Sequence, residues 1–484
     1  MKKTMILIII VLLILPVIVS CESREDIGGI DINDGDDVNV LNDKDDDADD
    51  LIKKPLSFVP AIIEKSFFEE NVLAAIPNDS KEQKLIESYY TLKGTDYVLD
   101  SNASQREKDD LLKIFRECTD VTENDIEIFV GSSEIMEIES FDGYLLKGRL
   151  VIPRGKKETD KLVILVNGSG PNTYINRRTG FNFYDTFSDE FSKLGIALFS
   201  YNTRGVDLGN DPPLYNIINK EEYQTYLPLN QVEDIYCMIN AIKENERLKN
   251  CKIYLLGLSE GTIIAPLVAE KYPDKVDGLF LWGYVNQNMK DVLVWQNTGG
   301  PSMVWYRAHF ETDEHGRISR ESYESDPNNV IASVLQNNTF ERIDNNNDGF
   351  ITEEDFAVLW KDIVGYNLED LLNSIERRDD EWLRKNYGGG ILPLTSAWFL
   401  EHFTLRSNME VLPGLDLPIY IFHGTLDQNV DVREVYKINE KFQELDKNNL
   451  TINVFENHNH DLNFNVQQIS AGIQAIFDAI TAIE

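Results

Sequence analysis

The stretch from Ile253 to Pro273, IYLLGLSEGTIIAPLVAEKYP, decides the fold of this chain. The apolar run at its start predicts a buried strand, and the pattern at its end predicts a helix. Between them, Gly257 and Gly261 flank Ser259. A serine exposed at so tight a turn has a strained backbone, and glycines remove the side chains that would crowd it. The helix N-terminus favours negative charge, so the stretch predicts a nucleophilic serine.

Strand and helix patterns alternate on both sides of this stretch. Strands are predicted within residues 133–153, about the turn at Asp142 and Gly143, and at residues 161–167, 195–202, 252–257, 277–285, 417–424 and 450–457. Helices are predicted at residues 184–194, 231–248, 259–272, 432–445 and 466–483. This alternation is typical of βαβ units, and it predicts an α/β fold with a mostly parallel sheet and helices on both faces. Residues 286–416 interrupt it with a polar, mainly helical block, which we interpret as a cap inserted between two strands.

A serine hydroxyl is a weak nucleophile and needs a base that an acid orients. In sheets of this kind the chain order is Ser, then Asp or Glu, then His. Asp427 follows the predicted strand at 417–424, and only two of the six histidines, His458 and His460, come after it. We predict Asp427 as the acid and His460 as the base, with His458 as the second choice.

Two neighbouring residues are weaker candidates. Asp431 is an alternative acid, although its position is more typical of a helix N-cap. His423 ends the predicted strand at 417–424 and indicates a structural hydrogen bond.

Five segments carry a resemblance to a known family. They are LVILVNGSGPNTYINRR (162–178), YNTRGVD (201–207), GLSEG (257–261), HGTLDQNV (423–430) and NHNHDL (457–462). The chain resembles an α/β-hydrolase, and most closely bacterial esterases and acyl hydrolases related to the serine aminopeptidase and prolyl oligopeptidase branches. The resemblance covers residues 133–285 and 417–484, which we expect to form the two parts of the hydrolase core.

This resemblance implies acyl transfer on Ser259, with a small acyl ester or a peptide as substrate. The family's usual His-Gly after the third strand is Asn167-Gly168 here. An oxyanion hole made of backbone N–H groups tolerates that change, and we assign these groups to Ser169 and Glu260. Arg204 resembles a family arginine that braces a loop. Because the fold alone does not select the leaving group, a peptidase stays an alternative to an esterase.

A second motif lies in the predicted cap. Residues 344–355 match the twelve-residue EF-hand loop, whose oxygen ligands wrap a calcium ion. The predicted ligands are Asp344, Asn346, Asp348, Phe350 through its carbonyl, Thr352 and Asp355. The last position holds Asp rather than Glu, which makes bidentate binding harder and predicts lower affinity or tolerance of magnesium. The pattern identifies one such loop, which we expect to act as a structural clip; a polar Asn-rich loop without metal is the alternative.

The N-terminal residues predict targeting rather than folded structure. Residues 1–20 combine two lysines with an apolar run, and Cys21 follows Ile18-Val19-Ser20, which resembles a lipoprotein lipobox. Lipidation of Cys21 would place the protein on the extracytoplasmic face of the cell membrane; a simple secretory signal or anchor helix is the alternative. Residues 21–55 are rich in acidic side chains and predict a disordered tether. Residues 56–132 carry two helical patterns, near 60–75 and 104–118, and no chemical motif.

Composition narrows the function further. The chain has 484 residues and a net charge of −37, and such a charge argues against nucleic acid as a partner because phosphates are repelled. The odd number of cysteines left after Cys21 does not indicate a disulfide framework. A calcium-dependent binding lipoprotein that does no catalysis is the remaining alternative, and the set of Ser259, Asp427 and His460 speaks against it. The oligomeric state does not follow from the sequence.

Overall fold

The computed structural model describes residues 59–60, 62–93, 96–100, 103–121, 132–153, 159–178, 181–212, 215–335, 338–387, 392–466 and 468–483. The chain divides into two compact units, with the boundary between Val130 and Gly131. The predicted signal peptide, Cys21 and the acidic tether lie outside the described residues. Among the residues that are described, no helix combines the length and the apolar character needed to cross a membrane.

The smaller unit combines a short antiparallel sheet with helices. Its strands lie in the order β1-β3-β2, and its elements are β1 (Ile62–Glu64), α2 (Lys65–Phe67), the π-helical turn η1 (Phe68–Leu73), α3 (Lys81–Tyr89), β2 (Tyr90–Lys93), β3 (Asp96–Leu99) and α4 (Gln105–Cys118). The helix predicted at 104–118 is confirmed as α4, which a capping box of Ser104 and Glu107 begins. The helical pattern at 60–75 is wrong at its start, because residues 62–64 pair with β3 as a strand. Pairing with a distant segment overrides the local pattern there.

The larger unit is built on one eight-stranded sheet. Its strands in spatial order are β17 (Leu450–Phe455), β16 (Ile419–Gly424), β13 (Gly278–Trp282), β12 (Lys252–Leu258), β6 (Lys161–Val166), β9 (Ala197–Tyr201), β5 (Leu145–Ile152) and β4 (Ser132–Glu139). β5 is antiparallel to both of its neighbours, and every other neighbouring pair is parallel. All the strands predicted for this sheet are confirmed to within a few residues.

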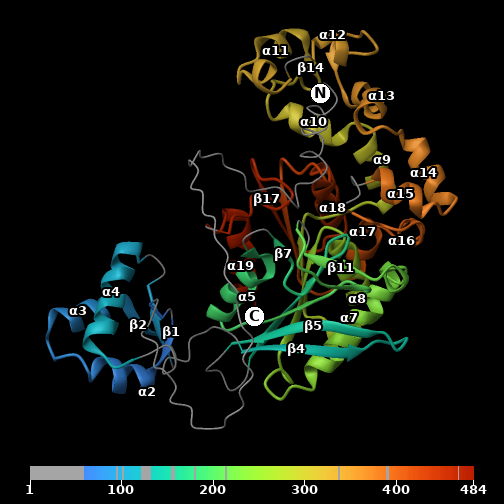
Figure 1. Cartoon of the computed structure of the whole chain (residues 1–484). Helices are drawn as coiled ribbons and strands as arrows, with labels where there is room; N and C mark the ends of the chain where they lie inside the picture. The colour runs from blue at the N-terminus through green and yellow to red at the C-terminus, as the bar shows by residue number, and fades with distance from the viewer. Residues whose placement is uncertain are drawn as a thin grey trace, which may run out of the picture. The chain divides into compact units, whose positions relative to one another are not determined.

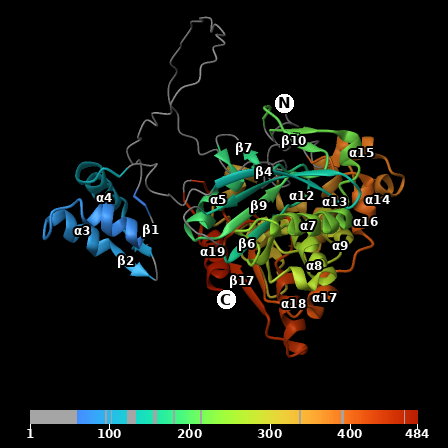
Figure 2. The same cartoon turned by 90° about the horizontal axis from the view of Figure 1, so that it is seen from below.

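Helices cover both faces of the sheet, as predicted. Buried side chains of α7 (Pro228–Lys243), α8 (Gly261–Lys271) and α18 (Arg433–Glu444) share one apolar core with the sheet. Side chains of α5 (Phe183–Lys193) and α19 (Ala471–Ala482) share the core on the other face. Figure 2 shows these two groups on opposite sides of the strands. The strand order, the single antiparallel strand β5 and the two helical layers define an α/β-hydrolase fold.

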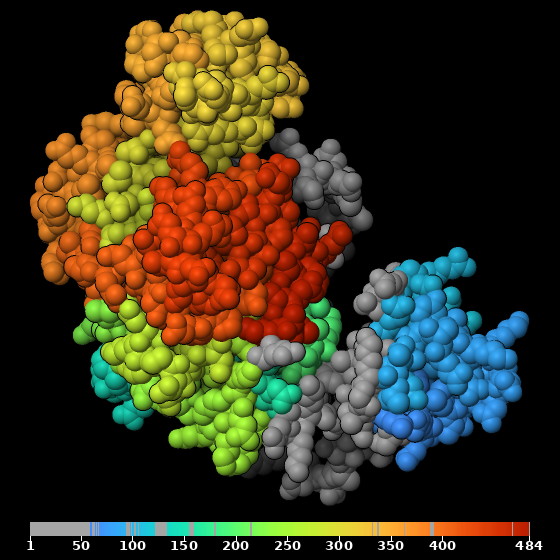
Figure 3. Space-filling model, turned by 180° about the vertical axis from the view of Figure 1, so that it is seen from behind, coloured from blue at the N-terminus to red at the C-terminus, as the bar shows by residue number. Residues whose placement is uncertain are grey.

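The cap connects two strands that are neighbours in the sheet, β13 and β16. Its helices are α9 (Met289–Asn297), α10 (Gly300–Arg307), α11 (Arg320–Ser325), α12 (Phe340–Ile343), α13 (Glu353–Val364), α14 (Leu368–Glu376), α15 (Asp380–Asn386), α16 (Ser396–His402) and α17 (Asn408–Val411). Figure 1 shows α10 to α13 gathered above the sheet, and Figure 3 shows this yellow and orange lobe beside the red residues after 417. The lobe has its own apolar core between Met303 and Phe356.

Candidate active site

Ser259 lies at the turn between β12 and α8. Its φ is +52°, a left-handed conformation that is rare for a residue with a side chain. Both flanking glycines are needed for this turn. A Cβ added to Gly257 would lie 2.4 Å from the carbonyl oxygen of Gly261, and one added to Gly261 would lie 2.2 Å from that of Val166. The two glycines therefore allow a sharp turn after β12, and Ser259 at this turn lines the cavity.

Asp427 and His460 meet beside the carboxyl ends of the strands. His460 Nδ1 lies 2.7 Å from Asp427 Oδ2. The other carboxylate oxygen of Asp427 accepts the backbone N–H groups of Asn429 and Val430, at 2.8 and 2.9 Å. Burial alone would raise the pKa of Asp427, but the charge of His460 outweighs it and the pKa lies below its usual value. Asp427 is thus an ionised carboxylate that fixes one nitrogen of the imidazole.

Trp282, the last residue of β13, connects the serine with the histidine. Its carbonyl accepts the Ser259 N–H at 2.9 Å, and its indole Nε1 donates to the His460 carbonyl, also at 2.9 Å. The next residue, Gly283, lies directly against the imidazole, because an added Cβ would lie 2.6 Å from His460 Cε1. Ser259 and His460 line the same cavity, and within the described part of the chain they are not hydrogen-bonded to each other. Such contacts often form only when a substrate is bound.

The electrostatics of His460 suit a base. Burial alone would lower the pKa of His460, but the neighbouring carboxylate of Asp427 raises it above the usual histidine value. A higher pKa makes the imidazole a better proton acceptor while it is neutral.

The other candidates have different surroundings. His458 Nδ1 lies 2.8 Å from the Glu456 carbonyl, and His458 is absent from the cavity wall. His423 is fully buried, with Nε2 at 3.2 Å from the Val430 carbonyl and 3.3 Å from Asp427 Oδ2. Burial lowers the pKa of His423. Asp431 pairs with Arg433 at the start of α18.

The predicted oxyanion donors come from two separate segments. Ser169 follows β6 and lines the cavity, and Glu260 follows the serine. Within the described part of the chain, no other protein group accepts either backbone N–H. Asn167 is not available for catalysis, because its amide donates to the Tyr201 carbonyl and accepts from Tyr184 Oη. These two hydrogen bonds fix the start of the loop that bears Ser169.

The cavity between sheet and cap has a volume of about 260 Å³. The sequence motifs supply its polar end, with Ser169, Ser259 and His460. The cap supplies an aromatic wall made of Trp360, Tyr366, Tyr387, Trp398 and Phe399. From sequence, the tryptophans of this region fit an apolar entrance or a core equally in kind, and the structure places Trp360 and Trp398 on the cavity wall.

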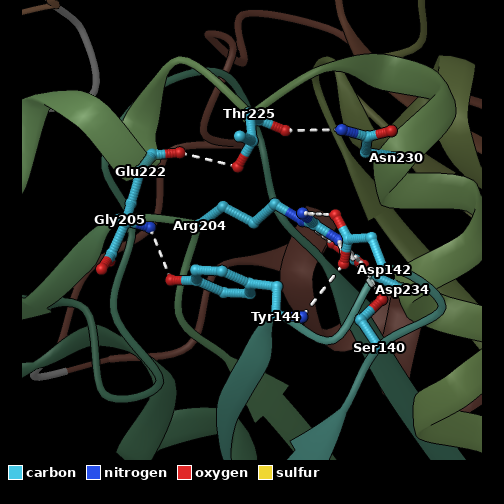
Figure 4. Close-up of polar contacts among 9 residues, drawn as sticks. All are labelled: Ser140, Asp142, Tyr144, Arg204, Gly205, Glu222, Thr225, Asn230 and Asp234. Atoms are coloured by element: carbon cyan, nitrogen blue, oxygen red, sulfur yellow. Dashed lines mark hydrogen bonds and ion pairs between the residues drawn. The ribbon is translucent and has the colours of Figure 1, made fainter.

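Arg204 braces the loop after β9, as the resemblance predicts. Its guanidinium is 2 % exposed and donates to Asp234 at 2.6 and 2.7 Å and to Asp142 at 2.6 and 3.1 Å. The ring of Tyr144 lies below it, and the Tyr144 hydroxyl accepts the Gly205 N–H at 2.7 Å (Figure 4). Arg204 is absent from the cavity wall and therefore acts on the fold.

Backbone N–H groups of the 344–355 loop donate to two carboxylates of the same loop. Gly349 has a φ of +89°, and Asp344 accepts the N–H groups of Asp348 and Gly349, both at 3.1 Å. The Asp355 carboxylate accepts the N–H groups of Asn345 and Thr352, both at 2.9 Å. In the described part of the chain, no three His, Cys, Asp or Glu side chains are close enough together to hold a metal. The oxygen donors of the predicted loop are of the kind that calcium prefers.

The structure adds a second loop that the sequence pattern did not identify. Strand β14 (Ile318–Ser319) pairs with β15 (Phe350–Ile351), with Ile318 opposite Ile351, so a loop within residues 311–322 meets the 344–355 loop at these two strands. This second loop has Gly316 at its turn, with a φ of +72°, but only Glu311 and Asp313 are carboxylates at ligand positions. Arg317 donates to Asp313 at 2.9 Å and neutralises it. His315 and Ser322 stand at two of the other ligand positions, so these residues do not match the calcium-loop pattern of residues 344–355.

Comparison with known proteins finds only distantly similar solved structures. No protein-family model matches the chain, and no curated protein matches it. It is similar to a carboxyl esterase from Bacillus coagulans, at 14 % identity and a TM-score of 0.42 over 72 % of this chain and 97 % of that one. It is similar to Est1E from Butyrivibrio proteoclasticus, at 12 % identity and a TM-score of 0.38 over 72 % of this chain and 96 % of that one. It is also similar to the Pyrococcus horikoshii acylaminoacyl peptidase, at 13 % and 0.38 over 68 % of this chain, but spans only 38 % of that protein.

Proposed function

We propose that this protein is a serine hydrolase that cleaves carboxylic esters through an acyl-enzyme on Ser259. The observation that carries the proposal is the 2.7 Å contact between Asp427 and His460, because His460 lines the same cavity as Ser259. These residues supply the alcohol, the base and the acid that nucleophilic catalysis requires.

In the proposed reaction, Ser259 Oγ attacks the ester carbonyl while His460 Nε2 takes the hydroxyl proton. Asp427 holds the Nδ1–H of His460 and stabilises the imidazolium. The tetrahedral oxyanion accepts the N–H groups of Ser169 and Glu260, each of which lowers the barrier by about 3 kcal/mol. The C–O bond then breaks, and the alcohol leaves with the proton of His460. Water, deprotonated by His460, releases the acid and frees Ser259.

The residues that the cap contributes to the cavity favour an ester with an apolar or aromatic group as substrate. The aromatic side chains of the cap line the same cavity as the serine, and this cavity is large enough for a small molecule. Rings of this kind exclude water and bind apolar surface. An aminoacyl amide, the substrate of a peptidase, is the second candidate to be compared.

A fluorophosphonate probe tests the proposal directly. Wild-type protein should be labelled and should hydrolyse p-nitrophenyl esters faster than aminoacyl p-nitroanilides, and Ser259→Ala should lose both properties. Labelling with faster amide cleavage would indicate the peptidase. If folded wild-type protein is not labelled, the serine hydrolase is excluded and the non-catalytic binding lipoprotein is the remaining alternative.

Two further parts of the proposal concern the cap and the N-terminus. We propose that calcium binds the 344–355 loop and stabilises the cap lobe by closing the loop on itself, with no part in the chemistry. We also propose that Cys21 carries a lipid that tethers the protein to the extracytoplasmic face of the membrane. Incorporation of an alkyne-labelled fatty acid into wild-type protein, and its loss in Cys21→Ser, tests this tether.

A further inference from the structure

The side chain of Glu260, the residue after the serine, is buried and fully engaged. Its carboxylate is 0 % exposed and accepts four hydrogen bonds. The donors are Tyr226 Oη at 2.5 Å, Gln231 Nε2 at 2.8 Å, Trp398 Nε1 at 3.0 Å and His402 Nε2 at 3.0 Å. Burial alone would raise the pKa of Glu260, but the hydrogen bond from His402 and the other donors outweigh it, and the pKa is lowered. An ionised carboxylate so close to a developing oxyanion is unfavourable for catalysis, so its presence calls for a specific role.

Tyr226 connects this carboxylate with the opposite side of the oxyanion hole. Because an ionised carboxylate only accepts, the Tyr226 hydroxyl must donate its proton to Glu260. Its oxygen is then free to accept, and it accepts the N–H of Gly170 at 3.2 Å. Gly170 directly follows Ser169, the other predicted oxyanion donor.

Gly170 is held on its second side as well. Its carbonyl accepts the Thr203 hydroxyl at 2.9 Å, and its φ of +100° suits glycine. With both its N–H and its carbonyl fixed, Gly170 anchors the chain one peptide after the one that bears the Ser169 N–H. The position of the Ser169 N–H therefore depends on Tyr226 and Thr203.

We propose that Glu260 and Tyr226 are positioning residues that hold the two oxyanion donors in register. Glu260 bears one donor on its own backbone, and through Tyr226 its side chain fixes the loop that bears the other. The same carboxylate binds Trp398, which belongs to the cavity wall, so the cap is tied to this register. The inference rests on the proposed function, since it assigns parts of the same reaction.

Tyr226→Phe tests the inference, with Tyr223→Phe as the matched control. Tyr223 is also buried and its ring lies 5.4 Å from that of Tyr226, but its hydroxyl has no partner among the described residues. Tyr226→Phe should lower kcat by about tenfold or more, less than the loss of a whole oxyanion donor, with KM within about twofold. Tyr223→Phe should keep both values.

A transition-state mimic separates positioning from a general loss of structure. The serine hydroxyl adds to the carbonyl of a trifluoromethyl ketone, and the product carries an oxyanion in the oxyanion hole. The Ki of this inhibitor for Tyr226→Phe should therefore rise by the same factor as kcat/KM falls. Thr203→Val, which releases Gly170 from the other side, should act in the same direction and tests the inference if Tyr226→Phe does not fold. Wild-type kcat in folded Tyr226→Phe, or a loss confined to KM, would overturn the inference. Inactive wild-type protein, or activity in Ser259→Ala, would instead overturn the proposed function.

Discussion

The core and the cap use the same kinds of element for different purposes. In the core, buried strands end at one edge of the sheet, and Ser259, Asp427 and His460 lie in the turns just beyond those ends. In the cap, short helices pack around small apolar clusters, and they contribute aromatic walls and paired loops rather than reactive groups. The difference separates the proposed chemistry from the choice of substrate, and substitutions in the two regions should therefore affect different quantities.

The largest effect is expected from the core histidines, which offer a matched pair. His460→Ala should lower kcat by a factor on the order of 10⁴ or more, because the serine loses its base. His458→Ala, two residues away and outside the cavity wall, should stay close to wild type. Steady-state hydrolysis of one p-nitrophenyl ester measures both. Equal losses in the two variants would contradict the assignment of His460.

A change of the acid should alter both rate and pH dependence. His460 must be neutral to accept a proton, so kcat/KM should rise with pH as His460 deprotonates. Asp427 raises the pKa of His460, so this rise in wild type should lie above the usual histidine value of 6.5. Asp427→Asn removes the charge, and the rise should move to lower pH while kcat falls by about 10⁴. A pH profile unchanged by Asp427→Asn would show that another group sets it.

In the cap, a substitution in the cavity wall should change affinity more than rate. Trp360 lies on α13 and lines the cavity, while Val358 on the same helix is 65 % exposed. Trp360→Leu should raise KM by about tenfold for aromatic esters and less for acetate esters, because apolar contact area is lost. Val358→Ala serves as the control and should change neither value. A loss in kcat alone would place Trp360 with the core residues.

The smallest effect is expected from the cap loops, where the two loops themselves form the comparison. Calcium should raise the melting temperature of wild-type protein by a few degrees and leave kcat nearly unchanged. Asp344→Asn, in the 344–355 loop, should abolish this rise. Asp313→Asn changes a carboxylate that already pairs with Arg317, so this variant should keep the calcium-dependent rise in melting temperature. A rise that survives Asp344→Asn would place any calcium elsewhere.

The core could be predicted from sequence because its signals are local. Each buried strand is a short apolar run, and the turn at Ser259 requires glycine at positions 257 and 261, where a Cβ would clash with the backbone. The cavity wall of the cap could not be predicted in the same way, because it depends on how several short helices pack together. The loop within residues 311–322 does not follow from the sequence because it lacks the side chains of the calcium-loop pattern, and its place beside residues 344–355 depends on the pairing of β14 with β15. Tyr226 and Glu260 were missed as a pair because their contact joins segments far apart in the chain.

Gly283 has one more consequence, for how such an enzyme can be altered. With a φ of +64° and the imidazole of His460 directly above it, the position excludes even a methyl group. A new substrate pocket therefore cannot be engineered from the end of β13, where any larger residue would push out the base. Libraries aimed at new substrate specificity should keep Gly283 and vary the aromatic cavity wall of the cap, for example at Trp360 and Phe399.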